Sequence, residues 1–212
     1  MSITWIIIGV TALISFLAFD NRALMDRLIL HPTAVSRRGQ YYRLLTHGLV
    51  HQDGKHLLFN MLTLYFFGPA IERVLTSLGG PWAFPLFYLM ALVVSILPWQ
   101  HANRARTDTA SLGASGAVSA VLFAYILFDP WATLLLFFVI PAPAIVLAVG
   151  YVAYSIYMDR KGGDKINHSA HLWGAAFGVA FMLVIEPNVL ELFLDRLMNP
   201  RFNPMGGRFG ML

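Results

Sequence analysis

The sequence predicts an all-α, polytopic membrane protein whose helices form a bundle. Hydrophobic residues make up 58% of the 212 residues and charged residues only 12%, about half of the charged fraction of an ordinary soluble domain. The charged residues are also clustered, and they leave uncharged stretches close to the length of about 20 residues that crosses a bilayer. Composition and charge spacing therefore predict the same fold class.

Each uncharged stretch predicts one helix. The first begins near the amino terminus without a preceding basic residue or a following small-residue cleavage site, so we predict a retained helix rather than a signal peptide. The second ends before Glu72 and Arg73, and the polar residues 101–108 separate the third from the fourth. The stretch after Asp129 is too long for one span and contains two prolines, which predicts a surface segment over 131–140 before the fifth helix. The six predicted spans are 3–19, 56–71, 81–100, 109–128, 144–158 and 169–185.

These spans predict one membrane domain over residues 1–198. Residues 20–55 form the one long loop and carry most of the net charge, and residues 199–212 resemble a disordered tail. The chain has no cysteine, which excludes disulfides, thiol catalysis and cysteine-ligated metals. The net charge of +4 is small and no basic run is present, so no nucleic-acid partner is expected.

Polar residues inside the predicted spans gather at one end of the bundle. His56 and Asn60 open the second span, Ser115 lies in the fourth, and His168 and His171 begin the sixth. The starts of helices two, four and six share one membrane face, because each follows an odd-numbered helix. A serine among small residues is usually a packing residue, and a single histidine at a span's end is usually interfacial. One catalytic site, however, explains all of these residues together.

The chemistry that this set of groups can perform is acyl transfer to water. A serine hydroxyl becomes a strong nucleophile when a base takes its proton, and His171 is the candidate base for Ser115. The backbone N–H of Ser115, the Asn60 amide and the His56 ring are candidate donors to the oxyanion. Small residues on the fourth and sixth helices, such as Gly116 and Gly174, allow the close approach that this pair needs.

Three motifs in this order resemble the rhomboid family of intramembrane serine proteases. They are HLLFN at 56–60, GASG at 113–116 and AHLWG at 170–174. The resemblance implies a catalytic dyad of Ser115 and His171, with His56 and Asn60 helping to bind the oxyanion. It also implies a serine endopeptidase that needs no cofactor or metal and acts on transmembrane protein substrates in the lipid bilayer. We expect a multi-pass protein of the bacterial cytoplasmic (inner) membrane.

Two features depart from the family pattern. Some members carry a tyrosine four residues after the nucleophile, where it stacks on the base, and this chain has Ser119 there. We hypothesise that Ser119 hydrogen-bonds the His171 ring instead.

The second feature is the membrane orientation. Most of the 15 Lys and Arg residues lie in loops on the catalytic face, so the positive-inside rule places that face in the cytoplasm. The family resemblance implies the opposite orientation, which we favour because the long first loop is expected to pack on the bundle.

Other functions are less consistent with the same residues. A metalloprotease using His47, His51 and His56 would be expected to contain HExxH, and no His-Glu pair occurs in the chain. An aspartyl intramembrane protease needs aspartates within the spans, and the predicted spans contain none. The main alternative is a non-catalytic rhomboid-like protein that binds transmembrane helices, although such a protein has no physical need for the four candidate site residues.

Overall fold

The computed structural model describes residues 2–136, 139–163 and 166–200, and these residues are mostly helical. Apart from Asn199 and Pro200, the predicted tail at 199–212 lies outside the described residues. The elements in chain order are α1 (Ile3–Phe19), α2 (Arg22–Leu28), α3 (Pro32–Arg38), α4 (Arg43–Thr46), the 3-10 turn η1 (His47–Leu49), α5 (Gly54–Gly79), α6 (Ala83–Ala102), α7 (Ser115–Phe128), β1 (Thr133–Leu136), β2 (Ile140–Pro143), α8 (Ala144–Lys161), α9 (His168–Ile185) and α10 (Val189–Met198).

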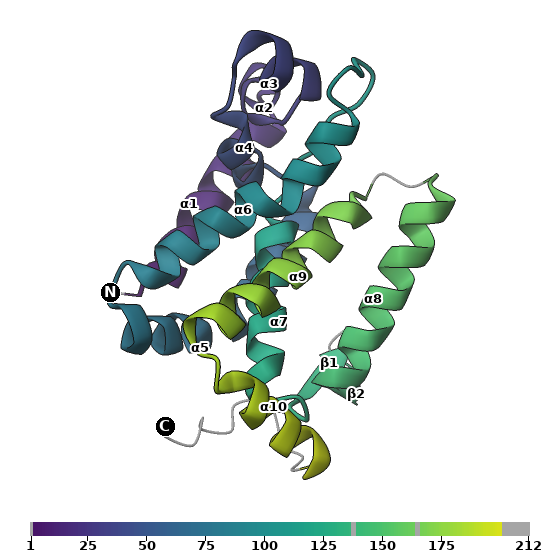
Figure 1. The fold of residues 1–212 in the computed structure, drawn as a ribbon. Helices are drawn as coiled ribbons and strands as arrows, with labels where there is room; N and C mark the ends of the chain where they lie inside the picture. The colour runs from purple at the N-terminus through teal and green to yellow at the C-terminus, as the bar shows by residue number, and fades with distance from the viewer. Residues whose placement is uncertain (1, 137–138, 164–165, 201–212) are drawn as a thin grey trace.

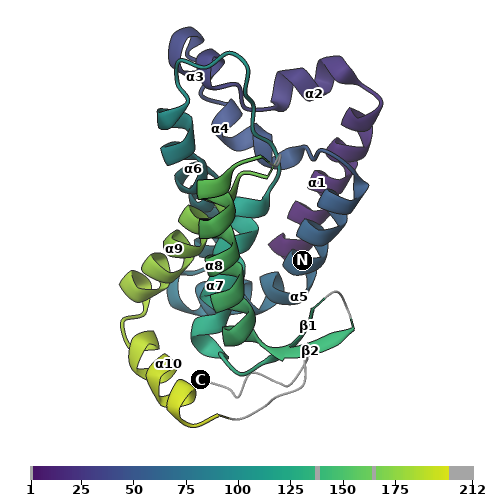
Figure 2. The same cartoon turned by 90° about the vertical axis from the view of Figure 1, so that its right-hand side faces the viewer.

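Helix α7 runs through the middle of the bundle and contacts α5, α6 and α9 (Figure 1). Large side chains from these helices fill the core, and Phe87 of α6, Val121 of α7 and Met182 of α9 are completely buried. Helix α8 lies along the side formed by α7 and α9 (Figure 2). Among the described helices, α6 and α9 are long and apolar enough to cross a membrane, while α1 and α7 are apolar but shorter.

Glycines bring α7 and α9 into direct backbone contact. A Cβ atom on Gly174 would lie 2.0 Å from the carbonyl oxygen of Gly116, and one on Gly178 would lie 2.2 Å from that of Ala120. Only residues without a side chain allow two helices to approach this closely. The contact begins at the first turn of α7 and the second turn of α9, and it holds the starts of the two helices together.

Each predicted span overlaps one helix, but two of the predicted ends are wrong. The second helix continues past Glu72 and ends at Gly79. The Glu72 carboxylate caps α1, because it accepts hydrogen bonds from the backbone N–H groups of Ile3 at 2.7 Å and Thr4 at 3.0 Å. The fourth helix begins at Ser115 rather than at 109, since Ser111 pairs with Leu30 in a β-bridge just before it.

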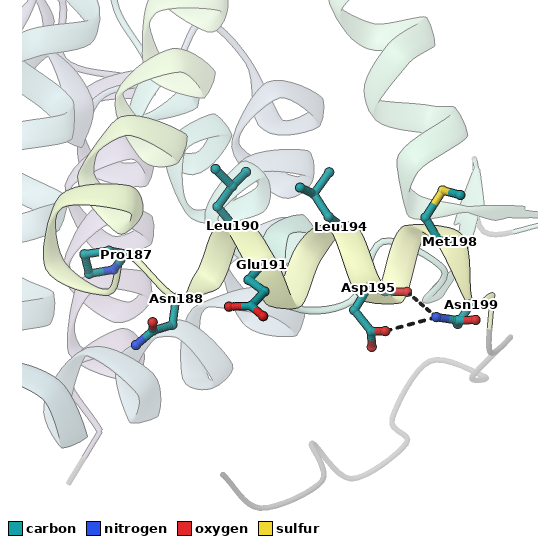
Figure 3. A pocket seen from close by; sticks show the side chains of 8 residues that line it. All are labelled: Pro187, Asn188, Leu190, Glu191, Leu194, Asp195, Met198 and Asn199. Carbon is teal, nitrogen blue, oxygen red and sulfur yellow. Dashed lines mark hydrogen bonds between the residues drawn. The ribbon is translucent and has the colours of Figure 1, made fainter.

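The prediction of an all-α fold is incomplete. Strands β1 and β2 form an antiparallel hairpin in the region predicted as a surface segment over 131–140. An additional helix, α10, follows α9, and Arg196 ties it to the end of α7 by donating to the carbonyl of Phe128. The exposed side chains of Leu190, Leu194 and Met198 follow one side of α10 beside a pocket at its surface (Figure 3). The residues that line this pocket come directly after α9 in the chain, and none of them belongs to the site described below.

The long first loop is folded and packs on the bundle. Arg43 is buried and donates to the backbone carbonyls of Asp26 and Ile29 and to the side chain of Gln40. A guanidinium that satisfies its donors in this way stabilises the loop. This basic residue of the first loop therefore has a structural role, which weakens an orientation argument based on counting charges.

Candidate active site

The site forms where the first turns of α7 and α9 meet. Ser115 is the first residue of α7, and His171 lies in the first turn of α9. The Nε2 atom of His171 is 2.8 Å from the Oγ atom of Ser115, which is a hydrogen bond across the two helices. Asn167 fixes the beginning of α9 because its side chain accepts from the N–H of Ala170. In this geometry the imidazole can take the serine proton directly.

His56 and Asn60 of α5 approach the same site from the other side. The His56 ring lies against Gly113, where an added Cβ atom would be 2.6 Å from the ring's Cε1 atom. Gly113 also has a φ of +108°, so this position needs glycine for both backbone and space. Asn60 is buried one turn further along α5, and its Nδ2 atom donates to the His56 carbonyl at 2.9 Å.

Buried His51 connects the segment before the nucleophile to α1. The Ser15 hydroxyl donates to the carbonyl of Leu49 at 2.9 Å and also lies 2.9 Å from the Nδ1 atom of His51. Because the hydroxyl has a single proton, Nδ1 of His51 donates to Ser15. Its Nε2 atom is then free to accept the N–H of Ala114 at 3.3 Å. His51 is therefore neutral and holds Ala114, the residue before Ser115.

The electrostatics of this loop agree with a neutral His51. Burial is the main cause that lowers the pKa of His51 to about 3, with a smaller effect of neighbouring His56. Burial likewise lowers the pKa of His47 to about 4. The part of the chain that the structure describes contains no group of three or more His, Asp or Glu side chains that could hold a metal ion.

The hypothesis for Ser119 is wrong, because its hydroxyl hydrogen-bonds Tyr151 of α8 rather than the His171 ring. The two hydroxyl oxygens are 2.6 Å apart. The ring of Tyr151 is stacked on the His171 ring, with centroids 5.8 Å apart and planes inclined by 18°. A tyrosine therefore does stack on the candidate base, but it comes from α8. The predicted site residues do not include Tyr151, because a stacking tyrosine was expected only on the helix of the nucleophile.

A cavity of about 840 Å³ lies between α5 and α8 and reaches His171. Phe59 and Phe66 line it from α5, and Leu147 and Tyr151 line it from α8. Most of its other lining residues are also apolar or aromatic. Such a surface accepts a hydrophobic segment more readily than a polar solute.

Comparison with known proteins adds to this geometry. A family model described as "Rhomboid domain" matches residues 38–188. "RHOMBOID-like protein 12, mitochondrial" of Arabidopsis thaliana is 36% identical over 154 residues, which cover 66% of this chain and 45% of that protein. "Rhomboid protein 1, mitochondrial" of Saccharomyces cerevisiae is 34% identical over 134 residues, which cover 62% of this chain and 38% of that protein.

A bacterial protein is also similar. "Putative rhomboid protease YdcA" of Bacillus subtilis is 28% identical over 146 residues, which cover 66% of this chain and 65% of that protein. The matched region thus spans less than half of each of the two mitochondrial relatives.

Proposed function

The chain belongs to the rhomboid family, whose members are integral membrane proteins, and from this premise we propose that it is an intramembrane serine endopeptidase. The observation that carries the proposal is the 2.8 Å hydrogen bond between Ser115 and His171. Nucleophile and base within hydrogen-bond reach are the minimum that serine hydrolysis requires. The six helices that correspond to the predicted spans would then be the transmembrane helices of the enzyme.

In the proposed reaction, Nε2 of His171 takes the proton of Ser115 while the serine oxygen attacks the carbonyl carbon of the scissile peptide bond. The negative charge on the carbonyl oxygen is stabilised by the N–H of Ser115, the Asn60 amide and the His56 ring. The N-cap residue of α7, Ala114, makes no side-chain cap hydrogen bond, so the positive end of the helix dipole contributes at the same place. His171 then gives its proton to the leaving amine, and water cleaves the acyl-enzyme by the reverse proton transfers.

The proposed substrates are transmembrane segments that reach Ser115 through the cavity between α5 and α8. A helical peptide bond is shielded by its own hydrogen bonding, so the substrate must unwind before attack. Segments with Gly, Pro or other weak helix formers should unwind most easily. A bacterial inner membrane is not supported as the location, because two of the relatives are named as mitochondrial.

The test uses purified protein in liposomes with a fluorogenic transmembrane substrate. Cleavage by the wild type and its loss in Ser115→Ala and His171→Ala are expected, together with phosphonate labelling of Ser115 identified by mass spectrometry. Triad variants in serine hydrolases typically lose about 10⁴-fold or more in kcat. Cleavage that persists in Ser115→Ala would refute the proposal. A wild type that binds the substrate without cleaving it would favour the non-catalytic alternative.

A further inference from the structure

Helix α8 presents two tyrosines to the two histidines at the start of α9. Tyr151 stacks on His171, and Tyr154 meets His168 edge-on, with ring centroids 5.6 Å apart. The His168 ring also meets the His171 ring edge-on, with centroids 5.8 Å apart and planes inclined by 75°. The His171 imidazole therefore has one ring against its face and another at its side.

Tyr151 is itself fixed from α7. The buried Ser119 hydroxyl is 2.6 Å from its hydroxyl. The Phe123 ring packs near its ring, with centroids 5.9 Å apart. Ser115, Ser119 and Phe123 are spaced four residues apart and share one face of α7. This face contacts the candidate base directly through Ser115 and indirectly through Tyr151.

A general base must be held in the orientation in which its nitrogen reaches the nucleophile. After proton transfer, the imidazolium also gains from an aromatic face beside it. We propose that Tyr151 is the positioning residue for His171 and that Ser119 holds it there, a role that rests on the proposed serine hydrolase function. Because Tyr151 belongs to α8, a movement of α8 away from α7 would withdraw the stack and misplace the base.

The experiment compares Tyr151→Leu, Tyr151→Phe and Tyr157→Leu. Tyr157 is an exposed tyrosine on the same helix and does not line the cavity, so its variant controls for changes to α8 itself. Kinetics are measured with the transmembrane substrate, the rate of phosphonate labelling of Ser115 is measured without substrate, and thermal unfolding reports folding.

In Tyr151→Leu, kcat and the labelling rate should each fall about three- to tenfold, the range expected for one aromatic pair. Because Tyr151 also lines the cavity, KM reports substrate binding as well, and the labelling rate measured without substrate is the readout that isolates the effect on the base. Tyr151→Phe keeps the ring and loses the bond to Ser119, so a smaller loss is expected. The exchange Ser119→Tyr with Tyr151→Ser supplies the ring from α7 and should restore part of the rate.

Equal kcat and labelling in Tyr151→Leu and Tyr157→Leu would overturn the inference, as would a loss confined to KM. These results differ from failure of the proposed function, in which the wild type is neither labelled nor active. If the wild type is neither labelled nor active, the positioning role is measured instead from the nitrogen NMR resonances of the His171 ring in isotope-labelled protein. A spectrum unchanged by Tyr151→Leu would overturn the positioning role, and a shift absent from Tyr157→Leu would support it.

Discussion

The substitution Gly174→Ala tests the geometry of the site most directly. Gly174 lies one turn after His171 on α9 and faces Gly116, the residue after the candidate nucleophile. A Cβ atom at position 174 would lie 2.0 Å from the carbonyl oxygen of Gly116 and 2.8 Å from its carbonyl carbon. Both contacts are with backbone, so no side-chain rotation can relieve them.

The size of the expected effect follows from these distances. An ordinary contact needs 3.4 Å or more, so α7 and α9 must move apart by about 1 Å or more at this turn. The Ser115–His171 distance of 2.8 Å would then pass the limit of a hydrogen bond. A misplacement of about 1 Å can lower the rate about 100-fold, and overpacking costs about 1–3 kcal/mol of unfolding free energy.

Gly178→Ala is the matched variant for this test. Its Cβ atom would lie 2.2 Å from the Ala120 carbonyl oxygen, so it makes a similar clash one turn further from Ser115. Gly9→Ala serves as an inert control, since its Cβ atom would meet nothing within 4 Å. We expect comparable losses of thermal stability at 174 and 178 and a much larger loss of kcat at 174. Similar kcat values for the two variants would refute the reasoning.

Three further predictions concern other parts of the site and fold. Replacing Glu72 by Gln removes the charge that caps α1, and we expect thermal unfolding to show a loss of about 1–2 kcal/mol with kcat unchanged. For His51, the folded pKa of about 3 lies below its ordinary value of 6.5, so the unfolded chain binds the proton first. Its contribution to stability is therefore complete above pH 6.5 and is lost as the pH falls toward 3, by up to about 1.4 kcal/mol per pH unit. Unfolding measured between pH 7 and 5 should be less pH-dependent in His51→Gln, and an equal slope would assign the loss to other groups. His56→Ala and Asn60→Ala should each lower kcat about 100- to 1000-fold in the cleavage assay, and a loss below tenfold would remove that residue from oxyanion binding.

The helices of the bundle could be predicted because apolar stretches bounded by charges determine them. The helix ends were harder to predict, since a charged residue ends a span only where it meets water. Glu72 shows this point, because its charge is satisfied by the N-terminus of α1 and α5 continues past it. The hairpin was missed because no pattern distinguishes a short surface hairpin from an irregular loop in so apolar a chain. Helix α10 was missed although Glu191 and Asp195 mark a polar face at helical spacing, because its 10 residues are too few for a membrane span.

Within the site, the proximity of Ser115 and His171 could be predicted because their helices begin on the same side of the bundle. The role of His51 could not be predicted, although the sequence shows a histidine shortly before the second span. Its tautomer depends on the single proton of Ser15, a residue far away in the sequence that looked like an ordinary packing residue of α1. To predict contacts of this kind, the rotation of each helix about its axis must be known, and only tertiary packing determines that rotation.

Tyr151 is a different case, because a sequence signal for it does exist. Helices α8 and α9 are consecutive and joined by a short loop, so they are expected to run antiparallel. In such a hairpin, successive facing pairs step backwards along one helix as they step forwards along the other, so two residues three apart on α8 can face two residues three apart on α9. Tyr154 with His168, and Tyr151 with His171, are two pairs centred on the same residue, Lys161, and both pairs are in ring contact. The spacing of two tyrosines three residues apart therefore matches the two histidines across the turn. A search for partners of a candidate base should include the preceding antiparallel helix, read backwards from the loop, as well as the helix of the nucleophile.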